Sequence, residues 1–214
     1  VWGVSRRSVP EFNDFPNFYH LKADILEDKF TRDLSSFLPP NTPFDLLVLN
    51  AGILGRIQSI QQANVEELKQ TMETNLWAQK KFLDVILKNS PRLFQTVAIS
   101  SGASVNGNKG WSGYSLSKAA FNMLIQLYAS EFPSTHFTSL APGLVDTKMQ
   151  DYLCEQVDNS VFPSVKKLIQ ARGTPNMPKP EELAPILELA MGHCLDFPSG
   201  SFQDIRKLRL SGES

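Results

Sequence analysis

The 214-residue chain is 42% hydrophobic and 20% charged, which suits the core of one ordinary domain. Its formal net charge of −1 lacks the basic excess of a general nucleic-acid binder, and its longest apolar run, residues 46–54, is far shorter than the ~20 residues of a membrane helix. The two cysteines form no CxxC pair and the three histidines show no metal-ligand spacing. We therefore expect a cytoplasmic, metal-free protein that binds neither membrane nor nucleic acid.

Apolar runs of strand length alternate with longer amphipathic segments along the whole chain. In chain order, we predict strands at 1–5, 18–24, 45–50, 96–100, 136–142 and 200–205, and helices at 29–38, 65–87, 114–132, 165–170 and 181–191. The near-continuous apolar character of the strands is typical of a parallel sheet covered on both faces. The sequence thus predicts one α/β domain over residues 1–214, with a doubly wound parallel sheet between two helix layers.

Residues 143–180 interrupt this alternation and contain four prolines, Pro163, Pro175, Pro178 and Pro180. Ligands of doubly wound sheets bind beyond the carboxyl ends of the strands, where such a segment can act as a lid. The sequence leaves two interpretations open, a substrate lid and a plain surface connection.

The densest chemical signal lies in ISSGASVNGNKGWSGYSLSK, residues 99–118. It places Ser101 just past a strand end, Tyr114 at the start of a helix and Lys118 one turn further on the same face. An ammonium about 4 Å from a phenol, at an effective dielectric of about 20, favours the phenolate by roughly 4 kcal/mol, or roughly 3 pKa units. Lys118 is therefore expected to lower the pKa of Tyr114, so that the phenol can give a proton to a carbonyl oxygen held by Ser101.

Two other interpretations of these letters exist. YxxxK occurs often by chance on a long helix, and Ser115 with Lys118 forms an SxxK, the nucleophile motif of penicillin-binding proteins. The second needs SDN and KTG partners, which this chain does not contain.

Here the sequence resembles the short-chain dehydrogenase/reductase family, a Rossmann-type fold, over nearly its whole length. Besides the trio Ser101, Tyr114 and Lys118, the matching motifs are Asp24-Ile25, Asn50-Ala51-Gly52, Asn75, Pro142-Gly143 and Thr147. The resemblance implies that Asp24 and Ile25 border the adenine, that the NAG motif supports the adenosine side, and that Asn75 helps bind a relay water. It also places Pro142, Gly143 and Thr147 beside the nicotinamide, and Tyr114 and Lys118 in contact with the cofactor.

Each motif also has an ordinary structural explanation. Asn50 and Asn75 could be satisfied buried amides, Pro142-Gly143 a simple turn, and Asp24 a helix cap. Taken together, in order and at the expected offsets, they favour the family.

The beginning of the chain, VWGVSRR, resembles the second strand of the dinucleotide fold. The resemblance implies a preceding first strand, a glycine-rich turn and a helix, together roughly 30 residues, which we expect in the protein although they are not in the sequence. Gly102, Gly107 and Gly110 do not replace the family's GxxxGxG. Arg6 and Arg7 follow this strand where the adenosine ribose is expected, and arginine there accommodates a 2′-phosphate. We therefore expect NADP(H).

Within the family, the resemblance extends to sepiapterin reductases and bacterial benzil reductases. It is carried by LNAGILG, KGWSGYSLSKAAFNML, APGLVDTKMQ and SGSFQD. It implies that Asp204 anchors a pterin, although the following IRKL departs from the sepiapterin reductase ending. Candidate pocket residues are Trp111, Leu144, Met149 and Tyr152, and ordinary packing under a lid explains them equally well.

The function that we expect is NADPH-dependent reduction of a ketone or dicarbonyl of a small conjugated substrate. The alternative is a non-catalytic NADP(H)-binding regulator or a truncated remnant. The helices at 65–87 and 114–132 resemble those through which family members pair, so we expect a homodimer or homotetramer.

Overall fold

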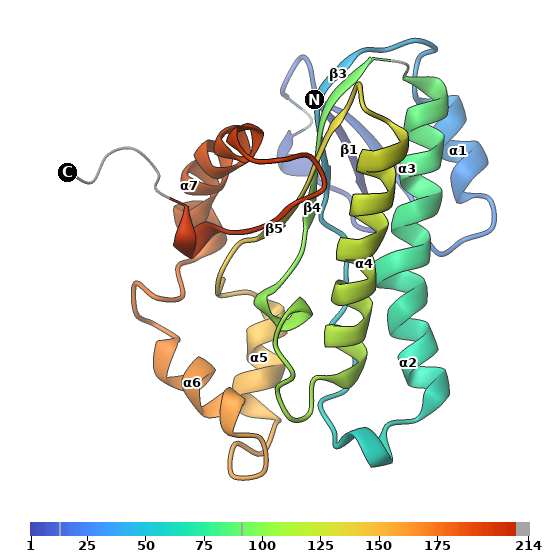
Figure 1. Ribbon diagram of the computed structural model, residues 1–214. Helices are drawn as coiled ribbons and strands as arrows, with labels where there is room; N and C mark the ends of the chain where they lie inside the picture. Colours follow the sequence, from blue (N-terminus) through green and yellow to red (C-terminus); the bar gives the residue numbers. More distant parts are fainter. Residues whose placement is uncertain (13, 91, 209–214) are drawn as a thin grey trace.

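The computed structural model describes residues 1–12, 14–90 and 92–208. Six parallel strands, coloured in chain order in Figure 1, alternate with helices that cover both faces. They are β1 (Trp2–Ser5), β2 (Tyr19–Lys22), β3 (Phe44–Leu49), β4 (Leu93–Ile99), β5 (His136–Ala141) and β6 (Phe202–Asp204). Each coincides with a predicted strand, which confirms the parallel α/β fold.

The strands form two sheets. One has the order β3-β4-β5-β6 and the other pairs β1 with β2. In the larger sheet Leu49 pairs with Ala98, and Ile99 pairs with Leu140. This parallel register brings the carboxyl ends of β3, β4 and β5 to one edge, so the residues that follow them lie close together.

Strand β3 pairs only with β4, and strand β1 only with β2. On β3, Leu46 and Val48 stay 42% and 38% exposed, whereas the neighbouring β4 is mostly buried. The described part of the chain therefore has an open strand edge in the sheet, where the family resemblance implies a further central strand.

Helices α1 (Phe30–Phe37), α3 (Ala78–Asn89) and α4 (Ser112–Glu131) cover one face, and α7 (Pro180–His193) covers the other (Figure 1). The core on the first face includes Phe30, Leu83, Phe121 and Phe137, and Trp2 and Val4 of β1 pack against it. The smaller sheet is thus joined to the larger one through this shared apolar cluster. A separate cluster lies between α7 and the strands, built on Val97, Leu140, Ala190 and Cys194.

The predicted helix at 65–87 is divided into α2 (Val65–Met72), a π-helical turn (Glu73–Trp77) and α3. The sequence analysis did not predict α5 (Lys148–Glu155), which lies in the segment 143–180 that interrupts the alternation of strands and helices. Helix α6 (Pro163–Ala171) begins at a proline, which suits the first turn of a helix because proline's missing N–H costs nothing there.

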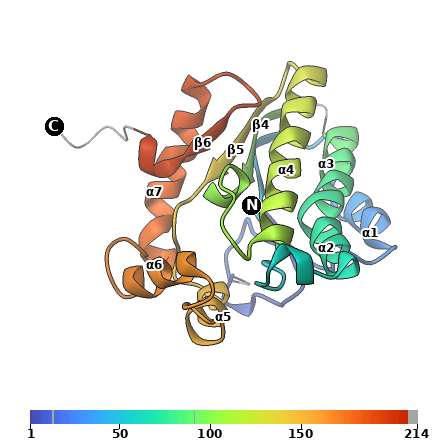
Figure 2. The same ribbon diagram turned by 60° about the horizontal axis from the view of Figure 1, so that its bottom comes forward.

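Residues 143–180, which contain α5 and α6, fold into a compact unit beyond the carboxyl ends of the strands (Figure 2). Their core of Leu153, Val165, Leu168 and Met177 is continuous with Leu54 and Ile57 from the loop after β3. The segment is therefore packed on the rest of the domain, and we call it the lid segment.

Polar bonds hold the lid segment in place. The Trp111 indole donates to Ser164 Oγ at 2.8 Å, and the Ile57 N–H donates to the Tyr152 hydroxyl at 3.3 Å. Within the segment, Arg172 pairs with Asp146 at 3.2 Å and also with Asp151 and Glu155. These contacts fix α5 and α6 against the loops that follow β3 and β4.

Among the residues described, no helix is both long enough and apolar enough to cross a lipid bilayer.

Candidate functional site

Helix α4 presents Tyr114, Lys118 and Asn122 at four-residue intervals, and therefore on one face. Lys118 Nζ donates to the carbonyl of Ile99, the last residue of β4, at 2.6 Å. Asn122 Oδ1 accepts from Ser100 Oγ at 2.6 Å, and Asn122 Nδ2 donates to Ser104 Oγ at 2.8 Å. These bonds fix the helix against the turn after β4, so Tyr114 is held opposite Ser101.

Ser101 begins the short 3-10 turn after β4, and its Oγ accepts from the Ala103 N–H at 3.1 Å. Burial raises the pKa of Tyr114 above its ordinary value, although the Ser101 hydroxyl lies close enough to the phenol to lower that pKa in part. The phenol therefore stays protonated around neutral pH, as a proton donor must.

The expectation that Lys118 brings the phenol pKa down is wrong for this arrangement of side chains. Lys118 Nζ lies over the Tyr114 ring, 5.9 Å from its centroid, and donates its hydrogen bond to the Ile99 carbonyl. Desolvation therefore outweighs any charge effect on Tyr114. It also acts on Lys118 itself, which is 4% exposed and whose pKa is lowered to about 8.

Asn75 lies in the π-helical turn and is buried. Its Oδ1 accepts from the Ile53 N–H at 2.7 Å, while Nδ2 donates to the Ile53 carbonyl at 2.8 Å and to Ser117 Oγ at 2.9 Å. The amide thus ties the loop after β3 to α4. Both N–H groups of the Asn75 amide are engaged within the chain. Neither is left to donate a hydrogen bond to a relay water.

Asn50, Ala51 and Gly52 follow β3 and are exposed, so the buried-amide interpretation fails for Asn50. The Ala51 carbonyl accepts from Gln79 Nε2 at 2.8 Å, which anchors the segment to α3. A Cβ added at Gly52 would lie 3.2 Å from Asn75 Oδ1 and 3.6 Å from Lys118 Nζ. The lack of a side chain at Gly52 therefore leaves Lys118 reachable from this side.

A cavity of about 620 Å³ brings together two predicted cofactor residues that are far apart in the sequence, Arg7 after β1 and Thr147 at the start of α5. Lys148, Met149 and Lys179 also line it, together with the acidic Asp146, Asp151 and Glu181. The Thr147 hydroxyl makes no capping bond to α5, so it can bind a ligand. Three cations and a free hydroxyl fit phosphate and carboxamide groups.

The remaining cofactor predictions fall around this cavity or at the ends of strands. Arg6 faces Asp24 at 3.9 Å, so of the two arginines only Arg7 lines the cavity. Asp24 also accepts from the Leu26 N–H at 3.0 Å, but this bond closes a turn before α1, whose N-cap is Lys29, so Asp24 is not a helix cap. Ile25 packs on the main core. Pro142 and Gly143 follow β5, where Gly143 has a φ of +78° that favours glycine.

The four predicted pocket residues, Trp111, Leu144, Met149 and Tyr152, all pack on the apolar cluster of the lid segment, as does Tyr114. The rings of Trp111 and Tyr114 lie 6.1 Å apart. The structure therefore gathers an apolar surface beside the phenol, although each of these side chains also has a packing role.

Asp204, the predicted substrate anchor, is 7% exposed and already bound within the chain. Its Oδ1 accepts from Arg206 Nε at 2.8 Å and from the Arg206 N–H at 3.1 Å, and its Oδ2 accepts from Nη2 at 2.5 Å. This fork of bonds lowers the pKa of Asp204. A pterin would have to displace Arg206 to reach the carboxylate.

Sequence reasoning missed two residues of this site, Asn122 and Arg206. Asn122 continues the four-residue spacing of Tyr114 and Lys118, a signal that the sequence contains. Arg206 belongs to the IRKL stretch, which departs from the sepiapterin reductase ending. That departure was the signal in the sequence that the surroundings of Asp204 differ from those in sepiapterin reductases.

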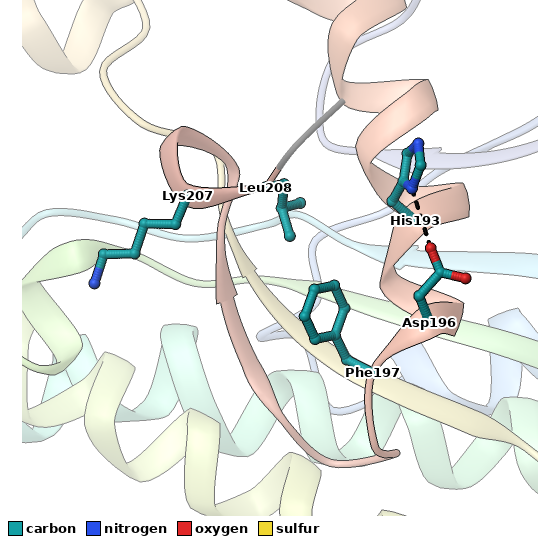
Figure 3. Close-up of a pocket in the computed structure, with 5 residues that line it drawn as sticks. All are labelled: His193, Asp196, Phe197, Lys207 and Leu208. Atoms are coloured by element: carbon teal, nitrogen blue, oxygen red, sulfur yellow. Dashed lines mark hydrogen bonds and ion pairs between the residues drawn. The ribbon is translucent and has the colours of Figure 1, made fainter. Parts of the chain in front are cut away.

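A second cavity, of about 300 Å³, lies between α7 and the end of the described chain and is lined by His193, Asp196, Phe197, Lys207 and Leu208 (Figure 3). His193 Nδ1 and Asp196 Oδ2 are 3.1 Å apart. None of the predicted site residues lines this cavity. Residues 1–12, 14–90 and 92–208 contain no cluster of three or more metal-ligating side chains.

Comparison with known proteins identifies the family and supports the fold. The family model for short chain dehydrogenases matches residues 11–158. An uncharacterized oxidoreductase of Schizosaccharomyces pombe, C30D10.05c, is 31% identical over 159 residues, which are 70% of this chain and 63% of that protein. A benzil reductase ((S)-benzoin forming) of Bacillus cereus is 28% identical over 217 aligned positions, covering 94% of this chain and 86% of that protein.

The bovine sepiapterin reductase is 36% identical over 131 residues, which are 58% of this chain and 48% of that protein. The chain thus spans about half to two thirds of the length of several curated relatives. In the crystal structure of the YIR035C short chain dehydrogenases/reductase from Saccharomyces cerevisiae, the fold superposes with a TM-score of 0.83 at 22% identity, over 98% of this chain and 87% of that one.

The family match extends over more than half of the sequence and includes Ser101, Tyr114 and Lys118. The chain therefore belongs to the short chain dehydrogenase family.

Proposed function

We propose that the protein is an NADPH-dependent carbonyl reductase. The observation that carries the proposal is the placement of the Ser101 hydroxyl close to the Tyr114 phenol, with Lys118 over the Tyr114 ring at the carboxyl edge of the sheet. The cavity lined by Arg7 and Thr147 supports a cofactor with phosphate groups. Membership of the family implies a nicotinamide cofactor. The preference for NADPH over NADH rests on Arg7.

When bound, the nicotinamide cofactor would supply a hydride to the carbonyl carbon. The chain's own residues then handle the proton and the geometry. Tyr114 donates its phenolic proton to the carbonyl oxygen, and the Ser101 hydroxyl holds that oxygen in line. Lys118 would bind a ribose hydroxyl of the cofactor through its ammonium group, on the side that Gly52 leaves open.

The apolar surface of Trp111, Leu144, Met149 and Tyr152 supports a small conjugated ketone or dicarbonyl. Similarity to proteins named benzil reductase and sepiapterin reductase supports the same class. Because Arg206 occupies the carboxylate of Asp204, we favour the diketone over the pterin. Both cysteines are free, which supports action in a reducing cytoplasm.

Replacing Tyr114 by Phe should lower turnover of benzil about a thousandfold, because the general acid is lost while the packing is kept. The rate is measured by the disappearance of NADPH, and NADPH binding is measured by titration calorimetry and should be unchanged. Tyr128→Phe is the matched control, since Tyr128 lies on the same helix but bonds to Asp84. Substantial residual turnover in Tyr114→Phe would contradict the assignment of Tyr114 as the general acid.

The wild type separates the alternative functions. A wild type that binds NADPH without turnover would favour the non-catalytic regulator, and one that does not bind NADPH would favour the truncated remnant.

The pH dependence should report Lys118, whose pKa is about 8. For reduction we expect kcat/KM to be level below about pH 8 and to fall above it, as the ammonium is lost.

Folding stability should change in the opposite direction with pH. Between about pH 8 and 10.5 the unfolded lysine binds a proton that the folded one does not, so the free energy of unfolding rises with pH. Denaturation of Lys118→Met should lack this rise, and an equal rise in that variant would contradict the assignment.

Arg7→Ala should raise the KM for NADPH about tenfold or more and leave that for NADH unchanged, because only NADPH carries the 2′-phosphate that a guanidinium binds. Steady-state kinetics with each cofactor checks this. Arg32→Ala on the exposed face of α1 is the control for loss of one positive charge. An equal increase in KM for NADPH and for NADH would show that Arg7 does not bind the 2′-phosphate.

We also propose a homodimer or homotetramer through α4 and the helices at 65–87. Leu116, Met123 and Leu127 form a stripe on this helix and are 54%, 54% and 52% exposed. The double variant Met123→Glu, Leu127→Glu should convert the assembly to monomers in light scattering, while Leu189→Glu on α7, where the side chain is 61% exposed, should not. A wild type that is already monomeric would contradict the proposal.

A further inference from the structure

The Arg206 guanidinium lies at the mouth of the proposed active site. It follows β6 in a short 3-10 turn, Ile205–Lys207. A Cβ added at Gly102, next to Ser101, would lie 3.4 Å from Arg206 Nη2. A Cβ added at Gly143 would lie 3.7 Å from Arg206 Cδ. The side chain therefore runs between the turn after β4 and the turn after β5, the two turns that border the reacting carbonyl.

Asp204 fixes the direction of this guanidinium. Three hydrogen bonds join the two residues, and the carboxylate is 7% exposed while the Arg206 side chain is 60% exposed. The bonds use Nε and one proton of Nη2. Among the described residues, Nη1 donates to no partner, so a pair of N–H groups stays available on the exposed side.

The charges of the site favour an anion. Asp204 neutralises one positive charge, and Arg206 and Lys118 supply two. A planar guanidinium that is already oriented loses little entropy when it binds a second carboxylate, and it binds carboxylates through two parallel hydrogen bonds. The apolar cluster that contains Trp111, Leu144 and Met149 also contains Tyr114, and it suits an apolar group on the same molecule.

We infer that Arg206 is a specificity-determining residue that binds a carboxylate next to the reacting carbonyl. This inference rests on the proposed reductase function and names its substrate class, 2-oxo acids with an aromatic or other apolar side chain. In the reaction the carbonyl π bond breaks as hydride from NADPH forms a C–H bond and the Tyr114 proton forms an O–H bond. The products are a 2-hydroxy acid and NADP⁺.

The test compares benzoylformate with its methyl ester, two substrates that differ in the carboxylate charge. The measured quantity is the ratio of kcat/KM for the acid to that for the ester, which corrects for changes in the amount of active protein. We expect the acid to be preferred by the wild type. Arg206→Gln should lower the ratio at least tenfold, and Arg206→Lys, which keeps the charge but loses the fork, should lower it less. Arg32→Gln on α1 removes one positive charge far from the site and should leave the ratio unchanged.

The outcomes separate the two proposals. A ratio that is the same in wild type and Arg206→Gln overturns the inference, while reduction of the ester still supports the reductase. If neither compound is reduced, the proposed function fails for this class, and calorimetry decides the inference. Benzoylformate binding to the wild type in the presence of NADPH that is lost in Arg206→Gln supports the carboxylate subsite, and equal or absent binding in both overturns it. If Arg206→Gln does not fold, Arg206→Lys carries the same comparison.

Discussion

The site depends on the hydrogen bonds that join α4 to the carboxyl end of β4. Lys118 reaches the Ile99 carbonyl, and Asn122 bonds to Ser100 and Ser104. A helix packed only through apolar contacts can slide or rotate at small cost, whereas buried polar groups are expensive to leave unpaired. These bonds therefore fix both the rotation and the height of the helix. The position of Tyr114 relative to the turn after β4 follows from them, and so does the opening toward Gly52.

Burial of these groups sets the stability of the fold against the reaction proposed for the site. A lysine buried this deeply destabilises the fold while it is charged, yet the reaction proposed for the site uses the charged form. Tyr114 likewise resists ionisation because it is buried. Functional sites often contain buried ionisable groups that lower the stability of the fold, and packing elsewhere compensates for that loss of stability. Here the compensation comes from the apolar cores on the two faces of the sheet and under the lid segment.

Local patterns predict the strands and most helices, because a strand covered on both faces must be apolar throughout. They fail for α5, which is short and polar on its outer side. In the site, the order of the motifs predicts that Ser101 and Tyr114 meet. It does not reveal that Lys118 lies over the Tyr114 ring or that Asp204 is held by Arg206, because both facts depend on which of several possible partners is nearest in space.

The bond from the Trp111 indole to Ser164 has a spectroscopic consequence. Trp111 is the N-cap of α4, while Ser164 belongs to α6, so the two separate if the lid segment moves away. Indole emission changes when its N–H loses a partner or meets water. Trp2 lies on β1 and Trp77 in the π-helical turn, so neither belongs to the lid segment. The chain thus carries a native fluorophore at the contact between α4 and the lid segment, and the two remaining tryptophans provide a steady background.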